Sequence, residues 1–362
     1  MVKRGLRIII AGGGTGGHIF PGVAIAEEFC KRGETAILFI GTGKKIERDI
    51  LADSGYDYRP IQVAGLKGKG LRRLLVALAQ LPGSIWESYR IVRDFHPQLV
   101  VGVGGYASGP AVLVAHWLGI KTAVAEQNAL PGLANRILGR FVERVFLTYA
   151  ETRKWFPKGT TVVTGNPVRA AFLPVARTEQ EKPPGEFNLL VFGGSQGAHA
   201  LNRAVASAIP QLAVEKQGLR IRHQTGQNDL EEVRDTYRCH GIRAEVSAFI
   251  SDMVAAYRRA DLVVCRAGAT SLAELTVMGK AAILIPFPFA VDDHQKKNAL
   301  GLVKAGAAVM IEEKELTGQK MAETIKKFYH HRALLREMET KAAAIGNVRA
   351  AVDIVDHCVA LL

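Results

Sequence analysis

Short apolar runs alternate with glycine loops and helical segments along most of the chain. Residues 6–11 form an apolar run rich in isoleucine. A glycine-rich loop leads from it into a segment with apolar residues at helical spacing, which ends at Gly33. Another apolar run follows at residue 35, and the alternation continues to about residue 165. This order of strand, helix and strand predicts a doubly wound, parallel α/β sheet.

The pattern changes between residues 165 and 187, where Pro, Gly and charged residues indicate a linker. The strand, glycine loop and helix then recur in FNLLVFGGSQGAHALN, residues 187–202. We therefore expect two Rossmann-like domains, residues 1–168 and 169–344, with a ligand cleft between their strand ends. Residues 345–362 have helical periodicity and are predicted to pack back on the first domain.

Composition and charge narrow the classes of function. A length of 362 residues suits two domains. Residues 1–168 carry 22 Lys and Arg against 12 Asp and Glu, so a basic first half could attract nucleic acid, anionic lipid or a phosphorylated substrate. The four cysteines form no CxxC pair, which indicates neither a zinc site nor a disulfide framework and fits a reducing cytosol. No window approaches the roughly 18 to 20 apolar residues of a membrane span.

The first glycine loop has the spacing of a dinucleotide-binding loop. Gly12, Gly14 and Gly17 satisfy G-x-G-x-x-G between a strand and a helix. The second strand ends near Lys44 rather than at an acidic residue, which disfavours NAD and leaves an NADP-dependent oxidoreductase as an alternative. His18 is an unusual residue for such a loop, because its bulky ring stands where a pyrophosphate would approach.

The second half offers a fuller nucleotide site. Ser195, within a glycine-rich turn at a helix start, suits a diphosphate, although such a turn also serves packing alone. Arg266 follows a strand and could face a phosphate, while Glu274 could accept both hydroxyls of a ribose or simply lie on the surface. Gln295 and Asn298 are amides suited to sugar hydroxyls, or polar residues of a helix start.

The sequence contains no Asp-X-Asp motif that would clamp a metal on a sugar diphosphate. Backbone amides, helix dipoles and the arginines Arg169 and Arg266 would then neutralise the diphosphate charge. We expect chemistry that needs neither a metal nor a cofactor.

Seven segments together resemble one family closely. They are GGTGGHIFPG, GVGGYASGPA, EQN, GNPVR, FGGSQGAHALN, CRAGATSLAE and DDHQKKNA, in that family's order and over nearly the whole chain. The chain resembles the MurG family, which adds N-acetylglucosamine (GlcNAc) to undecaprenyl-pyrophosphoryl-N-acetylmuramoyl-pentapeptide in peptidoglycan synthesis. The resemblance implies the glycosyltransferase B fold, two Rossmann-like doubly wound domains facing a cleft, and an inverting transfer from UDP-GlcNAc to the C4 hydroxyl of muramic acid.

The same resemblance implies which residues bind the donor. Ile250 would contact the uracil, Ser195 the diphosphate, Glu274 the ribose and Gln295 the GlcNAc hydroxyls. The other donor-side positions that it implies are Thr15, Gly16, Gly17, Asn128, Arg169, Ala269, Thr270, Ser271, Leu272 and Ala273. Arg266 and Asn298 are added to them on their residue chemistry alone.

Catalysis requires a base for the acceptor hydroxyl. His18 is the candidate, because an imidazole with an ordinary pKa of about 6.5 accepts a proton near neutral pH; the alternative is a structural hydrogen bond within the loop. Glu126 and Asn128 would orient the acceptor or His18. Lys44 stands where some relatives carry an acidic residue, so no carboxylate role is transferred there. The acceptor diphosphate would lie near Gly104, Gly105 and Tyr106.

A lipid-linked acceptor implies contact with a membrane. LKGKGLRRLLVALAQLPGSIW, residues 66–86, combines basic and apolar residues at helical spacing, as an interfacial helix or a plain amphipathic one does. The residues expected at the membrane are Arg72, Arg73, Leu74, Leu75, Leu78, Ile85 and Trp86. The resemblance implies peripheral attachment to the anionic cytoplasmic face of the inner membrane, with cell-division and cell-wall assembly proteins as possible partners. A nucleic-acid-binding protein would explain only the charge, and no recognition module supports it.

Overall fold

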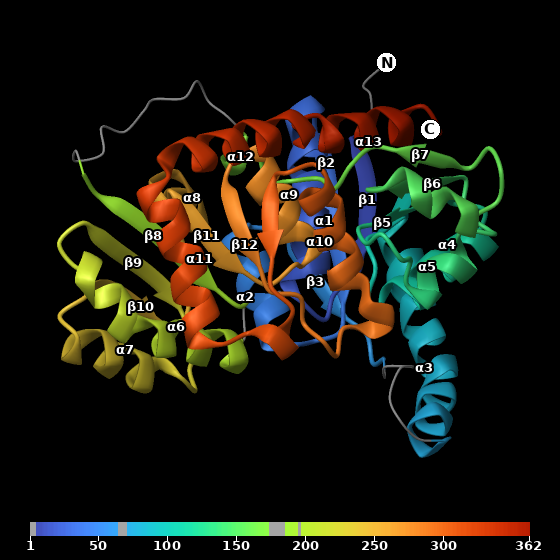
Figure 1. Ribbon diagram of the computed structural model, residues 1–362. Coiled ribbons are helices and arrows are strands. Elements are labelled where there is room, and N and C mark those ends of the chain that lie inside the picture. Colours follow the sequence, from blue (N-terminus) through green and yellow to red (C-terminus); the bar gives the residue numbers. More distant parts are fainter. Residues whose placement is uncertain (1–4, 64–70, 174–184, 195–196) are drawn as a thin grey trace. The chain divides into compact units, whose positions relative to one another are not determined.

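The computed structural model describes residues 5–63, 71–173, 185–194 and 197–362, and along 71–79 and at residue 291 only the backbone (Figure 1). The chain forms two compact units. Unit 1 comprises Met1–Ala170 and Asn347–Leu362, and unit 2 comprises Ala171–Gly346. The sequence pattern placed these divisions at residues 168 and 344.

Unit 1 is built on a parallel sheet. Among the described residues its strand order is β3-β2-β1-β4-β5-β6-β7, and neighbouring strands pair in parallel register. The strands are β1 (Leu6–Ala11), β2 (Thr35–Gly41), β3 (Asp57–Pro60), β4 (Leu99–Gly102), β5 (Lys121–Glu126), β6 (Arg144–Leu147) and β7 (Thr161–Val163).

Helices cover both faces of this sheet, because alternate strand residues are apolar on each face. Ile8 and Ile10 pack with α1 and α13, whereas Ile9 and Ala11 pack with α3 and α4. The helical segments of unit 1 are α1 (Gly16–Arg32), α2 (Lys45–Asp53), α3 (Leu71–Phe95), α4 (Ser108–Trp117), α5 (Leu133–Leu138), η1 (Ala150–Trp155) and α13 (Ala350–Val359).

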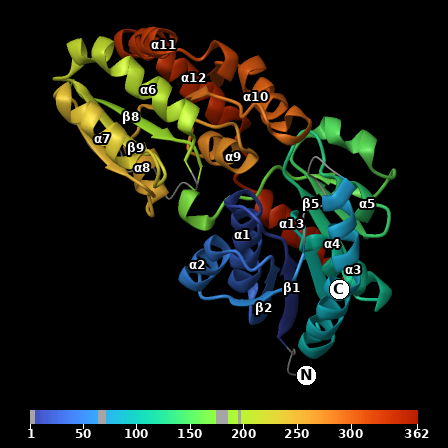
Figure 2. The same ribbon diagram turned by 90° about the horizontal axis from the view of Figure 1, so that it is seen from below.

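Unit 2 repeats the plan with the strand order β10-β9-β8-β11-β12-β13. The strands are β8 (Phe187–Phe192), β9 (Leu219–Gln224), β10 (Arg243–Ser247), β11 (Leu262–Cys265), β12 (Ala281–Leu284) and β13 (Ala308–Met310). The helical segments are η2 (Ala170–Phe172, which spans the division), α6 (His199–Leu212), η3 (Ala213–Glu215), α7 (Leu230–Cys239), α8 (Met253–Arg259), α9 (Ala269–Val277), η4 (Val291–Asp293), α10 (His294–Lys304), η5 (Glu313–Glu315), α11 (Gly318–His330) and α12 (Arg332–Ile345). Figure 2 shows α6, α7 and α8 around β8 and β9.

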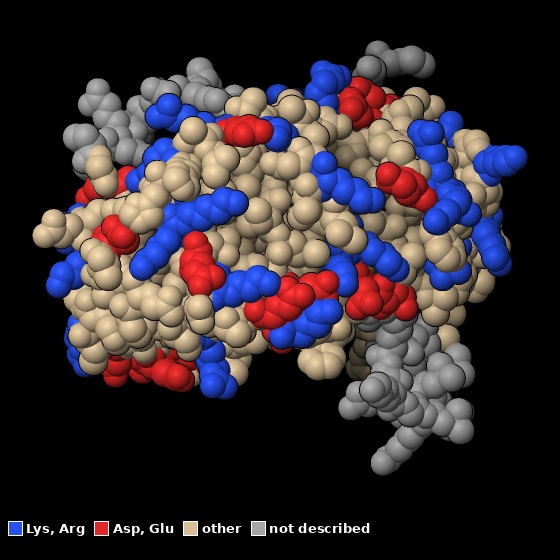
Figure 3. Space-filling model, viewed as in Figure 1, with Lys and Arg blue, Asp and Glu red and all other residues tan. Residues whose placement is uncertain are grey.

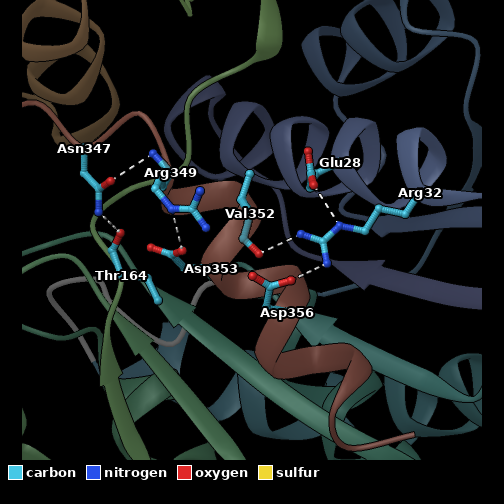
Figure 4. Close-up of polar contacts among 8 residues, drawn as sticks. All are labelled: Glu28, Arg32, Thr164, Asn347, Arg349, Val352, Asp353 and Asp356. Carbon is cyan, nitrogen blue, oxygen red and sulfur yellow. Dashed lines mark hydrogen bonds and ion pairs between the residues drawn. The ribbon is translucent and has the colours of Figure 1, made fainter.

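The last helix, α13, belongs to unit 1. Ile354, Val355 and Cys358 are fully buried in the core that α1 also lines. Polar contacts hold the helix at its edges: Arg32 of α1 binds Asp356 at 2.6 Å and donates to the carbonyl of Val352 at 3.0 Å (Figure 4). The final segment of the chain is therefore a structural part of the first sheet's cover.

Charges of both signs are mixed on one face of the molecule. On the face shown in Figure 3, Lys and Arg side chains lie interspersed with Asp and Glu. Among the helices that the structure describes, none is long and apolar enough to cross a membrane.

Candidate functional site

Two glycine loops interlock at the ends of β1 and β4. Gly13 donates its amide to the carbonyl of Gly104 at 3.3 Å. A Cβ atom on Gly105 would lie 2.2 Å from the carbonyl oxygen of Gly13, and one on Gly12 would lie 2.5 Å from a methyl group of Val103. Only residues without a side chain allow the two loops to approach this closely.

A buried carboxylate on α2, the helix after β2, holds the glycine loop that follows β1. Glu47 of α2 is fully buried and accepts hydrogen bonds from the amides of Gly14, Thr42 and Gly43. The hydroxyls of Thr42 and Tyr58 donate to it as well, each at 2.6 Å. Burial would raise the pKa of Glu47, but the hydrogen bonds outweigh burial and hold it below its ordinary value.

The carboxylate of Glu47 also explains why residues 13 and 41 are glycines. A Cβ on Gly13 would lie 2.6 Å from one oxygen of Glu47, and a Cβ on Gly41 would lie 2.5 Å from the other. The amides of Gly12 and Gly14 are already used, by the carbonyl of Ile40 and by Glu47. The amides of residues 12–14 are therefore all engaged within the protein.

His18 is half-buried in the first turn of α1. Its Nδ1 lies 3.1 Å from the carbonyl oxygen of Val103. Because a carbonyl oxygen only accepts, Nδ1 carries the proton in this contact, and Nε2 is then the basic nitrogen of the neutral ring. Gly104 makes room for the ring, since a Cβ there would lie 2.6 Å from Nδ1.

Glu126 ends β5 and shapes the loop that follows. The carboxylate is 3% exposed. One oxygen accepts from the amide of Asn128 at 3.0 Å and from its side chain at 3.3 Å, and the other accepts from Gly132 and Asn135. Burial raises the pKa of Glu126 although these hydrogen bonds oppose the rise. The contacts assign Glu126 to holding Asn128 in place.

Arg169 and the acceptor-side residues also lie in unit 1. The guanidinium of Arg169 stacks 4.1 Å from the ring centre of Phe20 on α1, and Glu27 accepts the next amide, that of Ala170, at 2.7 Å. Gly104 and Gly105 have φ angles of 87° and 81°, and Tyr106 beyond them is 41% exposed. Arg169 therefore packs against α1 beside Phe20.

In unit 2, one buried amide connects two of the predicted donor-binding segments. Gln224, at the end of β9, donates to the carbonyl of Gly194 at 2.8 Å and accepts from the amide of Ile250 at 2.8 Å. Gly197 must lack a side chain, because a Cβ there would lie 2.0 Å from the carbonyl oxygen of Thr225. Ser195 lies outside the described residues.

Arg266 and Glu274 follow β11, as expected, and both are buried. The guanidinium of Arg266 donates to the carbonyls of Ile285 and Pro286 and pairs with Glu313 at 2.6 Å. Glu274 accepts from the hydroxyl of Tyr257 at 3.4 Å. The carboxylate therefore lies on α9 beside a buried tyrosine, while Arg266 joins this region to the end of β12.

The residues of α9 and α10 differ in accessibility. Ala269, Thr270 and Leu272 are buried, whereas Ser271 and Ala273 are half-buried. On α10, Gln295 is half-buried and accepts from the amide of Phe287 at 3.0 Å, but Asn298 is fully buried. Gln295 is therefore the more accessible of the two amides.

The expected membrane segment is a helix, α3, over Leu71–Phe95. The side chains of Arg72, Arg73, Leu74, Leu75 and Leu78 lie outside the described residues. Ile85 is half-buried, and Trp86 is 61% exposed.

Neighbouring helices add apolar surface that the sequence analysis did not single out. Trp117 is 62% exposed at the end of α4, which packs against α3, and Leu118 and Phe141 are also exposed. Ile137 of α5 is an exposed apolar residue as well.

Sequence reasoning also missed Glu47 and Gln224. Glu47 follows Lys44 by three residues, and its only signal is the spacing GTxxxxE. Gln224 closes the strand LRIRHQ, a polar residue at a strand end beside a glycine loop. Both act on backbone groups of loops, and pairing between distant loops is not visible in a linear pattern.

The fold and the site define a class. Two α/β units, each with a parallel sheet and a glycine loop after its first strand, form the glycosyltransferase B fold. Residues 8–147 match the glycosyltransferase family 28 N-terminal domain, and residues 188–356 match the glycosyltransferase family 28 C-terminal domain.

Individual relatives identify the family within this class. The chain is 57% identical to a protein of Syntrophus aciditrophicus (strain SB) named UDP-N-acetylglucosamine--N-acetylmuramyl-(pentapeptide) pyrophosphoryl-undecaprenol N-acetylglucosamine transferase, over 99% of both chains. A protein of the same name from Myxococcus xanthus (strain DK1622) is 49% identical, over 99% of this chain and 93% of the relative. The crystal structure of Acinetobacter baumannii MurG matches 97% of this chain and 98% of its own with a TM-score of 0.75 and 31% identity. The chain therefore belongs to the MurG family within glycosyltransferase family 28.

Proposed function

We propose that this protein transfers GlcNAc from UDP-GlcNAc to the C4 hydroxyl of lipid-linked N-acetylmuramoyl-pentapeptide, with inversion at the sugar. The observation that carries the proposal is the 57% identity over 99% of both chains to a transferase of that name. The reaction is the lipid I to lipid II step of peptidoglycan synthesis.

The donor belongs to unit 2 in this proposal. Ile250 takes the uracil, Glu274 the ribose and Gln295 the GlcNAc hydroxyls. The hydrogen bonds of Gln224 to Gly194 and Ile250 support this, because they keep the segment for the diphosphate and the segment for the base at a fixed spacing. Gln224 is a positioning residue in this scheme.

The acceptor side belongs to unit 1. His18 removes the proton of the C4 hydroxyl through Nε2, and the Val103 carbonyl supports this role by holding the proton on Nδ1. Asn128, whose loop Glu126 holds, orients the sugar. Gly104, Gly105 and Tyr106 lie beside the acceptor diphosphate.

Charge on the departing UDP is neutralised without a metal. Helix N-termini and Arg169, which Phe20 holds by stacking, supply positive potential. Arg266 contributes less directly, since its guanidinium already pairs with Glu313.

The protein attaches to the cytoplasmic face of the inner membrane through α3 and its neighbours. The exposed Trp86 and Trp117, on two helices that pack together, support this, because tryptophan favours the membrane interface. Cell-division and cell-wall assembly proteins, and roles in cell shape and the cell cycle, are proposed on family resemblance alone.

The test is transfer of labelled GlcNAc from UDP-GlcNAc to a lipid-linked muramoyl-pentapeptide analogue, with EDTA present. Product in EDTA is the expected result. Absence of product with and without metal would contradict the transferase assignment, and product lost only on addition of EDTA would contradict the metal-free part. Two alternatives are checked in parallel, by a nicotinamide absorbance change for an oxidoreductase and by salt-dependent DNA retention for a nucleic-acid binder.

A further inference from the structure

Unit 2 contains a cavity of about 770 Å³ that the proposed reaction does not use. Its walls come from the first halves of β8, β9 and β10 and from the end of α8 (Figure 1). The groups proposed for the donor, Gly194, Ile250 and Glu274, follow the carboxyl ends of strands, or lie on the helix after one. In a parallel sheet these ends form the opposite edge, so the cavity is a separate place.

Arginines line the cavity in a regular array. Arg220 of β9 lies directly between Asn188 of β8 and Arg243 of β10 in the sheet register. Two residues further along the same two strands, Arg222 of β9 lies beside Glu245 of β10. Adjacent parallel strands are about 4.8 Å apart, so the array places Arg220 and Arg243 side by side in the cavity wall.

The charges of this array are only partly compensated. Glu186 pairs with Arg220 at 2.7 Å, and Glu245 lies 3.5 Å from Arg222. Three further arginines line the cavity and are exposed, with no ion-pair partner among the residues that the structure describes: Arg243, Arg258 and Arg259. Like charges gathered in one concavity repel one another, and a bound anion would relieve this repulsion.

The remaining wall is apolar and leaves space. Leu190 is buried at the cavity, and the α8 residues that line it beside the arginines, Ala256 and Ala260, are small and buried. Volumes of a few hundred to about 1,000 Å³ with mostly apolar walls and a few charged groups are typical of small-molecule sites.

We propose that this cavity binds a ligand that carries a phosphate monoester or pyrophosphate group on an apolar body. A guanidinium group can donate two parallel hydrogen bonds to the oxygens of one phosphate. A phosphate monoester also brings more than one negative charge to a place where three arginines have no acidic partner among the described residues. The apolar part of the cavity lining then faces the body of the ligand. The same phosphate monoester chemistry occurs in a soluble nucleotide-like molecule and in the phospholipid phosphatidic acid, and the experiment separates these sources.

The experiment uses the full chain with saturating UDP-GlcNAc, so that the proposed donor site is filled. Inorganic pyrophosphate is titrated by calorimetry into the wild type and into R243Q/R258Q/R259Q. The variant is expected to lose at least about tenfold in affinity. The matched control is R234Q/R238Q, which removes two exposed arginines of α7 that pair with acids of their own helix and is expected to bind as the wild type does.

A second arm measures co-sedimentation with phosphatidic acid and phosphatidylcholine vesicles. Loss of phosphatidic acid binding in the triple variant, beyond that of the control, identifies a lipid source, and loss in the pyrophosphate arm alone identifies a soluble one. Equal binding of triple variant and wild type in both arms overturns the proposal, as does the absence of binding in both. Unchanged UDP-GlcNAc affinity in the triple variant shows that it is folded, and keeps this result independent of the transferase assignment.

Discussion

Two ionisable side chains determine the shape of the glycine loop in unit 1. The space left by Gly13 and Gly41 is taken by the carboxylate of Glu47, and the space left by Gly104 is taken by the ring of His18. The glycines therefore serve close packing against the protein's own polar groups.

His18→Gln tests the proposed base. Gln keeps an amide that can donate to the Val103 carbonyl but has no basic nitrogen. We expect kcat to fall by about 100-fold or more while the affinity for UDP-GlcNAc changes little, because general base catalysis contributes about 10²- to 10⁴-fold. Steady-state kinetics with separate donor binding checks this, and near-normal turnover would remove His18 from catalysis.

Glu47→Gln tests the loop clamp. The new side chain turns one acceptor into an NH₂ group that faces donors, so buried amides lose their partner. We expect a loss of about 2–4 kcal/mol in the free energy of unfolding, measured by urea denaturation. Asp49→Asn on the exposed face of the same helix is the control and should change stability by less than about 0.5 kcal/mol. Equal effects of the two substitutions would contradict the clamp.

At the scale of elements, α13 completes the cover of the first sheet. Asn347, just before it, donates to the carbonyl of Thr164 at 2.7 Å and accepts from the amide of Arg349 at 2.9 Å (Figure 4). These contacts fix where the chain re-enters unit 1. The buried residues beyond them then dock on α1.

Ile354→Ala should therefore destabilise unit 1. Removing a fully buried isoleucine leaves a cavity and costs about 2–4 kcal/mol. Val359→Ala, at a 43% exposed position of the same helix, should cost less than about 1 kcal/mol. Thermal denaturation of both variants measures the difference, and a small effect of Ile354→Ala would show that α13 contributes little to the fold.

The proposed membrane surface of α3 and α4 is tested by Trp86→Ala with Trp117→Ala. We expect binding to phosphatidylglycerol vesicles to weaken roughly tenfold, about 1.4 kcal/mol, because apolar area is no longer buried in the interface. Val214→Ala in unit 2, at a 78% exposed position, is the control. Transfer to a water-soluble acceptor should be unchanged, and unaltered vesicle binding would contradict this surface.

At the scale of the whole molecule, one buried histidine makes stability depend on pH. His223 is fully buried, with Nδ1 2.7 Å from the hydroxyl of Tyr237 and Nε2 3.1 Å from the amide oxygen of Asn202. Burial lowers the pKa of His223 to about 3, although the charge of Asp229 opposes this. The native protein therefore keeps this ring neutral.

The unfolded chain binds a proton at this histidine below pH 6.5, whereas the folded chain does so only near pH 3. Stability is therefore complete above pH 6.5 and is lost as the pH falls below it, by up to about 1.4 kcal/mol per pH unit. Urea denaturation at pH 7.5 and pH 5.5 measures this for the wild type and for His223→Gln. We expect the wild type to lose more stability than the variant, and parallel losses would contradict a neutral buried ring.

The parallel sheet of each unit follows from patterns that the sequence contains. Apolar runs such as residues 6–11 and 187–192 become central strands, buried on both faces, because helices cover both sides. The sequence pattern also predicts the glycine loops after β1 and β8, because a glycine-rich segment follows each of these apolar runs. Exposure was less predictable: on α10, Gln295 is half-buried and Asn298 is fully buried, because helical spacing alone does not fix which face of α10 meets the core.

By itself, the sequence determined two doubly wound sheets, the family and the segments that carry its motifs, because these depend on local periodicity and on residues close together in the chain. The tertiary structure decided what the motif residues do. Glu47 and Gln224 act on loops far from them in sequence, His18 receives its tautomer from Val103, and the arginines of β9, β10 and α8 meet in one cavity. Such contacts are set by the register of parallel strands and by burial, which no linear spacing specifies.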